Sequence, residues 1–128
     1  MRWIPTLLLA LVLPVALAGK GEKIAFTGEY QWKDGGNDRL VATFTPDGEE
    51  SWKVKFEFDW NGKDYTWKGK ATGSLTDGSS FEGTARSKNG RRQWRFTGAI
   101  DDQGRLTGSH TEITGGRNYE TGTFELAR

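Results

Sequence analysis

The sequence predicts an all-β domain in which eight antiparallel strands form an up-and-down meander that closes into a small barrel. Apolar and polar residues alternate through most of the chain after residue 18. Seven turn signals separate eight such alternating segments. Nowhere in that part do apolar residues recur at helical spacing over three turns. A β-sandwich of two stacked sheets is the alternative architecture.

The alternation is clearest over residues 51–60, where aromatic and aliphatic residues such as Trp52, Phe56 and Trp60 alternate with charged ones such as Lys53 and Glu57. Only a half-buried β-strand places two such sets on opposite faces. The same pattern predicts seven further strands, over residues 24–32, 40–44, 65–75, 81–85, 94–100, 106–110 and 122–126.

The segments between the predicted strands are short and rich in residues that favour tight turns, as in Asn61-Gly62, Asp77-Gly78 and Asn89-Gly90. Eight strands joined in this way can close on themselves, which leaves interior room for side chains or for one small ligand. Seven glycines occupy the same alternate positions as the apolar residues and are therefore expected to face the interior. There they would make room for bulky groups, either the protein's own tryptophans or a ligand. These glycines are Gly28, Gly69, Gly73, Gly83, Gly98, Gly108 and Gly122.

In strand number and order this architecture resembles the calycins, the group of lipocalin-like and avidin-like barrels that hold small molecules. Lipocalins carry a Gly-x-Trp motif on the first strand, and the nearest match is Gly28-Glu29-Tyr30, with Trp32 two residues further on. The resemblance covers the whole chain after residue 18 and implies a small-molecule carrier. It does not assign a functional role to any individual residue of this sequence.

Composition excludes several classes of protein. The chain has 128 residues, one histidine, no cysteine and a net charge of +1. It therefore holds one domain at most, and it has neither a disulfide scaffold, a thiolate metal site nor a cysteine nucleophile. A mean hydropathy of −0.69 excludes a polytopic membrane protein. The near-neutral charge predicts no polyanion partner and no nucleic acid.

Residues 1–18 are typical of a secretory signal peptide. Arg2 precedes an apolar stretch over residues 4–15, and Ala16-Leu17-Ala18 forms a small-residue cleavage site. The stretch is too short for a membrane span, and Pro5 and Pro14 interrupt it. The sequence thus predicts a single barrel domain over residues 19–128 that is exported to the periplasm or the extracellular space.

Because neighbouring strands of a meander run in opposite directions, the end of one strand and the start of the next lie at the same end of the barrel. The residues at these positions predict that one end of the barrel is an aromatic and polar rim and that the opposite end is apolar. Such a mouth suits a small apolar or amphipathic ligand, because apolar walls supply affinity and a few polar groups orient the ligand. The competing interpretation is that the tryptophans fill the barrel as core. The predicted ligand-binding residues are Tyr30, Trp32, Trp60, Tyr65, Trp67, Trp94, His110, Glu112 and Glu120.

Two polar groupings complete the predicted rim. Arg86, Arg91, Arg92 and Arg95 surround the Asn89-Gly90 turn and are expected to contact an anionic group, unless they form a solvated turn. The alternation places His110, Glu112 and Glu120 on the same, inward face of the wall. A salt bridge at the rim is favoured there over a metal site or a glycosidase-like carboxylate pair. No metal and no cofactor is predicted.

These observations together predict an exported binding protein without enzymatic activity, since the chain contains no catalytic motif. Its partner would be a small molecule whose identity the sequence leaves open, as it does the oligomeric state. The alternative function is an adhesion, carbohydrate-binding or inhibitor module that acts through its loops or outer surface.

Overall fold

The computed structural model describes residues 22–76, 78–114 and 119–128, with the side chains of the last range from Thr121 onward. The predicted signal peptide, residues 1–18, lies outside the described residues. Within them the chain contains no helix with the length and hydrophobicity to cross a membrane. The strands of the described part are β1 (Ile24–Trp32), β2 (Asn37–Pro46), β3 (Ser51–Trp60), β4 (Lys63–Gly73), β5 (Ser80–Arg86), β6 (Gln93–Ile100), β7 (Arg105–Glu112) and β8 (Tyr119–Ala127).

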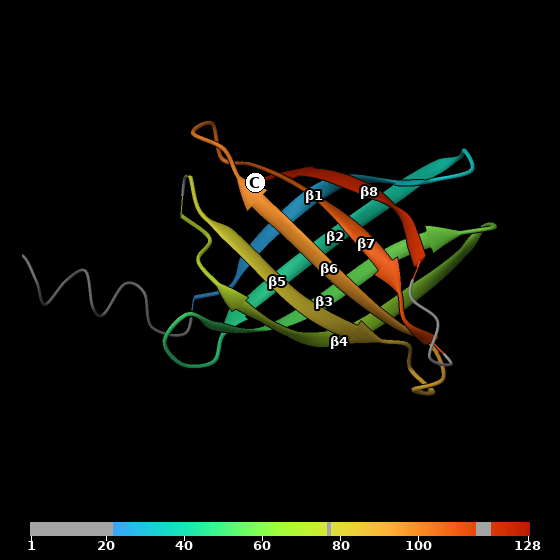
Figure 1. Ribbon diagram of the computed structural model, residues 1–128, viewed down its shortest axis with the longest axis horizontal. Helices are drawn as coiled ribbons and strands as arrows, with labels where there is room; N and C mark the ends of the chain where they lie inside the picture. The colour runs from blue at the N-terminus through green and yellow to red at the C-terminus, as the bar shows by residue number, and fades with distance from the viewer. Residues whose placement is uncertain (1–21, 77, 115–118) are drawn as a thin grey trace, which may run out of the picture.

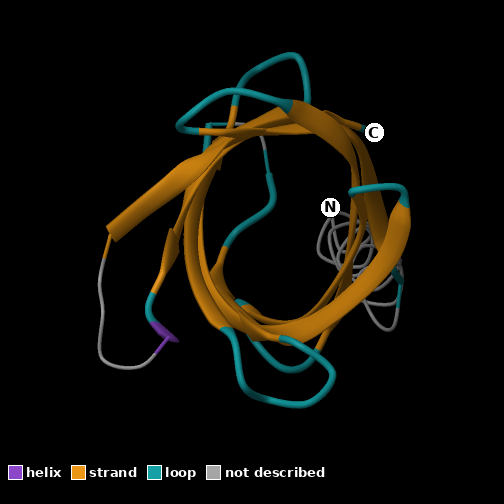
Figure 2. Cartoon of the chain, turned by 90° about the vertical axis from the view of Figure 1, so that its right-hand side faces the viewer, coloured by secondary structure: helices purple, strands orange, loops and turns teal. Residues whose placement is uncertain are grey.

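The described strands form a closed antiparallel barrel. Each strand pairs with the next along the chain, and β8 pairs with β1 from Thr27 opposite Ala127 to Trp32 opposite Gly122. Figure 1 shows the strands in chain order around the wall, and Figure 2 shows them as a ring seen from one end. The predicted all-β meander barrel is confirmed, and the β-sandwich alternative is not the architecture.

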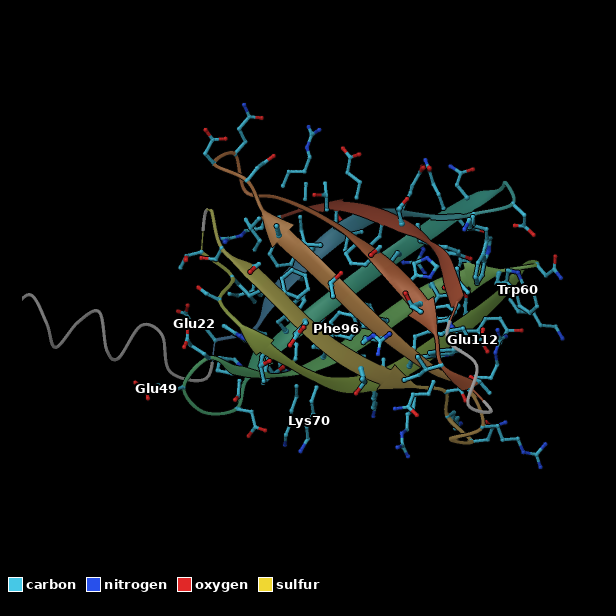
Figure 3. The ribbon with its side chains drawn as sticks, in the orientation of Figure 1. Glu22, Glu49, Trp60, Lys70, Phe96 and Glu112 are labelled. Atoms are coloured by element: carbon cyan, nitrogen blue, oxygen red, sulfur yellow. The ribbon has the colours of Figure 1, made fainter. Side chains whose placement is uncertain are left out.

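Phenylalanine rings fill most of the barrel interior. All seven phenylalanines of the chain are buried, and they pack mainly edge to face, as Phe56 and Phe96 do with ring centroids 4.9 Å apart. Figure 3 shows Phe96 inside the barrel. Of the tryptophans, Trp67 is buried, whereas Trp32, Trp52 and Trp94 are half-buried. The interior filler is therefore chiefly phenylalanine and not, as the sequence suggested, tryptophan.

Four of the inward-facing glycines, Gly73, Gly83, Gly98 and Gly108, lie directly opposite a phenylalanine on a neighbouring strand. Gly83 pairs with Phe96, and Gly108 pairs with Phe124. A Cβ added to Gly108 would lie 2.5 Å from Cζ of Phe124 and 2.1 Å from the carbonyl oxygen of Thr97. The ring therefore lies in the space that the missing side chain leaves, an arrangement that stabilises glycine within a strand.

A bulge interrupts the alternation in β8. His110 pairs with Gly122, but Thr111 pairs with Glu120, so Thr121 is an extra residue on β8. Thr121 is buried and contacts His110. The sequence pattern assigned Glu120 to the same face as Glu112, but the alternation of inward and outward residues does not continue through this bulge. The side chain of Glu120 itself lies outside the described residues.

Candidate functional site

An open pocket of about 1230 Å³ lies at the end of the barrel where the β3–β4 and β5–β6 hairpins turn. We call it the mouth pocket. Figure 3 shows Trp60 at this end of the molecule, on the side that faces the viewer in Figure 2. Aromatic, basic and small polar residues line it: Trp32, Phe58, Trp60, Asp64, Tyr65, Thr66, Trp67, Lys68, Arg86, Ser87, Lys88, Asn89, Arg92 and Trp94.

The pocket arises because β4 is longer than β5. β4 pairs with β3 as far as the last pair, Trp60 with Lys63, but it pairs with β5 only from Lys68 to Gly73. Residues 63–67 therefore project beyond β5. At the tip, Asn61 and Gly62 have φ angles of 53° and 75°, which fits the tight two-residue turn that this dipeptide favours. The mouth pocket lies between this projecting hairpin and the turn after Arg86.

Aromatic rings form the apolar side of the mouth pocket. Trp60 is 40% exposed and lies 5.9 Å from Tyr65 between ring centroids. Deeper in the pocket Trp94 packs against Trp67, with centroids 4.0 Å apart, and stacks on Phe58 at 5.7 Å. The pocket thus offers a graded apolar surface, from exposed Trp60 to buried Trp67, on which a flat or aliphatic group can pack.

Cationic side chains form the other side, because Lys68, Arg86, Lys88 and Arg92 all line the pocket. The acidic lining residue is Asp64, whose pKa is raised by the hydrogen bond and the charge of Asp59. Four cations against one acid give this side of the mouth pocket a positive potential, which favours an anionic group in a ligand.

Arg92 is held in place by a buried acid below it. Its Nη2 lies 2.7 Å from Oε1 of Glu112, and its Nε donates to Oε2 at 3.3 Å. Burial raises the pKa of Glu112, but hydrogen bonds from Arg92, Thr114 and Trp94 outweigh burial, so the net shift is downward. Glu112 therefore stays ionised at neutral pH. It positions Arg92 and does not line the pocket.

His110 belongs to the core beneath the pocket. The Thr121 hydroxyl donates to the carbonyl oxygen of His110 at 2.9 Å, so Nδ1 of the ring is the donor to Thr121 Oγ1, at 2.6 Å. Nε2 has no hydrogen-bond partner among the described residues. Burial lowers the pKa of His110 to about 4, and the nearby Gln31 carbonyl offsets this only in part. The ring is therefore neutral at pH 7 and stacks on Trp94.

Tyr30 is also a core residue. It is 3% exposed, its hydroxyl donates to the carbonyl oxygen of Asp59, and burial is the main cause that raises its pKa to about 12. Tyr30 and His110 line an interior cavity of about 20 Å³. Because that volume holds roughly one water molecule, this cavity is no ligand site, and the mouth pocket lies outside it.

The structure brings most, but not all, of the predicted site residues together. Trp32, Trp60, Tyr65, Trp67 and Trp94 line the mouth pocket, with Arg86 and Arg92. Tyr30, His110 and Glu112 are buried below it, Arg91 is exposed at the turn outside the lining, and Arg95 is on the outer wall. Among the described side chains no three of His, Asp and Glu lie together as a metal would require.

Sequence reasoning did not identify the lining residues with outward parity, above all Lys68 and Asp64. They reach the pocket because the end of β4 stands beyond β5. A signal for this exists in the sequence, since the predicted strand over residues 65–75 is longer than the one over 81–85. The missed lining residues are Asp64, Thr66, Lys68 and Ser87.

Comparison with known proteins adds no relative to this description. No protein-family model matches the chain, and neither curated proteins nor solved structures gave a significant match.

Proposed function

We propose that the protein is an exported, non-enzymatic binding protein that takes a small amphipathic anion into the mouth pocket. The observation that supports this most is the composition of the pocket, in which a wall of aromatic rings faces Lys68, Arg86, Lys88 and Arg92. A ligand with an apolar body and a carboxylate, sulfate or phosphate group would contact both sides at once.

The pocket has room for a small molecule and the chemistry to hold one. Its volume of about 1230 Å³ exceeds the roughly 300 to 1,000 Å³ of most ligand pockets, so a small ligand would occupy only part of it. Trp60 is the large hydrophobic residue that the described part of the chain leaves exposed. Trp60 shares the pocket lining with the four cations, so a ligand held by a cation could also cover its ring and remove apolar surface from water.

The test uses 8-anilinonaphthalene-1-sulfonate as the probe, because it carries flat apolar rings and one anionic group. We expect the wild-type protein to bind it with enhanced probe fluorescence. Trp60→Ala should weaken binding about 10-fold or more through lost contact area, and Arg86→Gln should weaken it by on the order of 10- to 100-fold through loss of a charge-assisted bond.

Two controls distinguish the mouth pocket from nonspecific adsorption. Trp52→Phe changes a half-buried tryptophan that lines no part of the mouth pocket, so it should leave binding unchanged. N-phenyl-1-naphthylamine, which lacks the sulfonate, should bind wild type and Arg86→Gln equally. Near-ultraviolet circular dichroism must show every variant folded. Equal affinity of wild type, Trp60→Ala and Arg86→Gln for the sulfonated probe would contradict the proposal.

A further inference from the structure

The outer wall across β3, β4, β5 and β6 gathers positive charge that the near-neutral composition conceals. Six exposed cations lie on the outward faces of these four strands, away from the phenylalanine core. We call them the basic belt: Lys53, Lys55, Lys68, Lys70, Arg86 and Arg95. Figure 3 shows Lys70 pointing away from the barrel. The whole chain has a net charge of only +1, so the belt reflects a strongly uneven distribution.

The strand register places these cations directly beside one another. Lys53 pairs with Lys70, Lys55 pairs with Lys68, and Lys68 pairs in turn with Arg86. Partners directly opposite on neighbouring strands have Cβ atoms about 5 Å apart, and like charges there destabilise a sheet. Two acids lie beside these cations: Glu57, whose Oε1 lies 3.7 Å from Lys55 Nζ, and Glu82, which is exposed on β5 and lies diagonally across from Lys70. The belt therefore opposes folding locally.

The fold does not explain this arrangement. Lysines on a sheet often protect a free edge against pairing with other chains, but a closed barrel has no edge to protect. Solubility requires charge, but it does not require like charges in direct cross-strand pairs. A binding role explains both the clustering and the repulsion, because a bound polyanion would neutralise the charges that repel one another.

We propose that the basic belt binds a linear acidic polysaccharide. The cations cross a convex barrel wall from β3 to β6, a surface that a flexible chain can follow and a flat bilayer cannot. Trp60, the exposed aromatic of the described residues, lies not on the belt but at the β3–β4 tip, next to the acidic pair Asp59 and Asp64. The tip thus does not suit an anionic membrane. Lys68 and Arg86 also line the aromatic mouth pocket, but the outward faces of β3 and β4 around Lys53, Lys55 and Lys70 carry no aromatic ring on which a single-stranded nucleic acid could stack.

The test uses heparin as the acidic polysaccharide and a triple variant, K53Q/K55Q/K70Q, whose residues do not line the mouth pocket. Affinity is measured by calorimetry at several salt concentrations. Wild-type affinity should fall steeply with salt, and the triple variant should show a slope of log Kd against log salt that is shallower by about 2. The matched control, K23Q/K33Q/R105Q, removes three exposed cations outside β3–β6 and should bind as wild type does.

Stability gives an independent measurement. Because the triple variant removes paired like charges, its melting temperature should equal or exceed that of wild type, and heparin should raise the melting temperature of wild type but not of the variant. Binding of 8-anilinonaphthalene-1-sulfonate should be the same in both, so failure here is separate from failure of the mouth pocket. Equal heparin binding by the triple variant and wild type would overturn the proposal. So would tighter binding to phosphatidylglycerol vesicles or to oligo(dT) than to heparin.

Discussion

Acidification should destabilise the barrel well above the pH at which carboxylates titrate, because His110 must remain neutral inside it. The ring is 4% exposed, and burial lowers its pKa from 6.5 to about 4. A group whose pKa is lower in the folded state stabilises the fold above its unfolded pKa, and that contribution is lost as pH falls toward the folded pKa. Stability should therefore decline from about pH 6.5 to about pH 4.

The size of the loss follows from these two pKa values. Between pH 7 and pH 5 the unfolded chain takes up a proton at His110 that the folded protein does not, which costs about 2 kcal/mol, and the loss reaches about 3 kcal/mol at pH 4. For a domain of this length about 2 kcal/mol lowers the melting temperature by roughly 8 °C. The carboxyls with lowered pKa values, such as Asp101 and Glu112, affect stability mainly below the interval from pH 7 to pH 5.

The assay is urea unfolding followed by tryptophan fluorescence at pH 7, 6 and 5, for wild type and for His110→Phe. Phenylalanine keeps a ring against Trp94 but cannot titrate, and the Thr121 hydroxyl can still donate to the backbone carbonyl of residue 110. The free energy of unfolding of wild type should fall by about 2 kcal/mol more than that of the variant. If both proteins lose the same stability between pH 7 and pH 5, His110 is not the titrating group and the reasoning is refuted.

Three further changes test the packing around the mouth pocket. Trp67→Ala should cost about 3–5 kcal/mol of unfolding free energy, measured by urea titration, because Trp67 is 4% exposed, whereas Trp60→Ala should cost under about 1 kcal/mol. Arg92→Gln should cost about 2–3 kcal/mol because it leaves Glu112 buried without its cation, and Lys88→Gln is the matched control with no expected loss. Gly108→Ala should cost about 1–3 kcal/mol or more of unfolding free energy, measured through the melting temperature, since its Cβ would clash with Phe124. Gly104→Ala has no such clash but lies at φ +76°, so it should cost about 1–2 kcal/mol through backbone strain alone.

The alternation of apolar and polar residues was sufficient to predict the barrel but not the details of its rim. The predicted ranges 24–32 and 51–60 coincide with β1 and β3, because alternation there is unbroken and the apolar set faces the barrel interior for most of each strand. The relative register of β4 and β5 depends on the six residues between them and on packing across the barrel. The unequal lengths of the predicted strands over 65–75 and 81–85 signal an overhang, but no local pattern encodes the register, so which end of β4 projects could not be predicted.

The roles of individual polar residues were also beyond the sequence. Arg92 and Glu112 are 20 positions apart and meet only through the β6–β7 pairing. His110 and Thr121 meet through a bulge, which adds one residue to β8 and has no marker in an alternating pattern. Phe81, Phe96 and Phe124 each pair with a glycine on a neighbouring strand, a match that depends on strand register and not on residue type alone.

The pairing of β1 with β8 makes completion of the barrel depend on the strand of the barrel that is synthesised last. Each of the seven hairpins joins strands that are neighbours in sequence. The β1–β8 pairing that closes the barrel instead joins residues as far apart as Thr27 and Ala127. Until β8 is present, β1 and β7 expose backbone donors and acceptors to any other strand they meet. A product truncated before residue 119 would retain that pair of open edges, so damage to the final strand should lead to self-association rather than to a slightly weakened monomer.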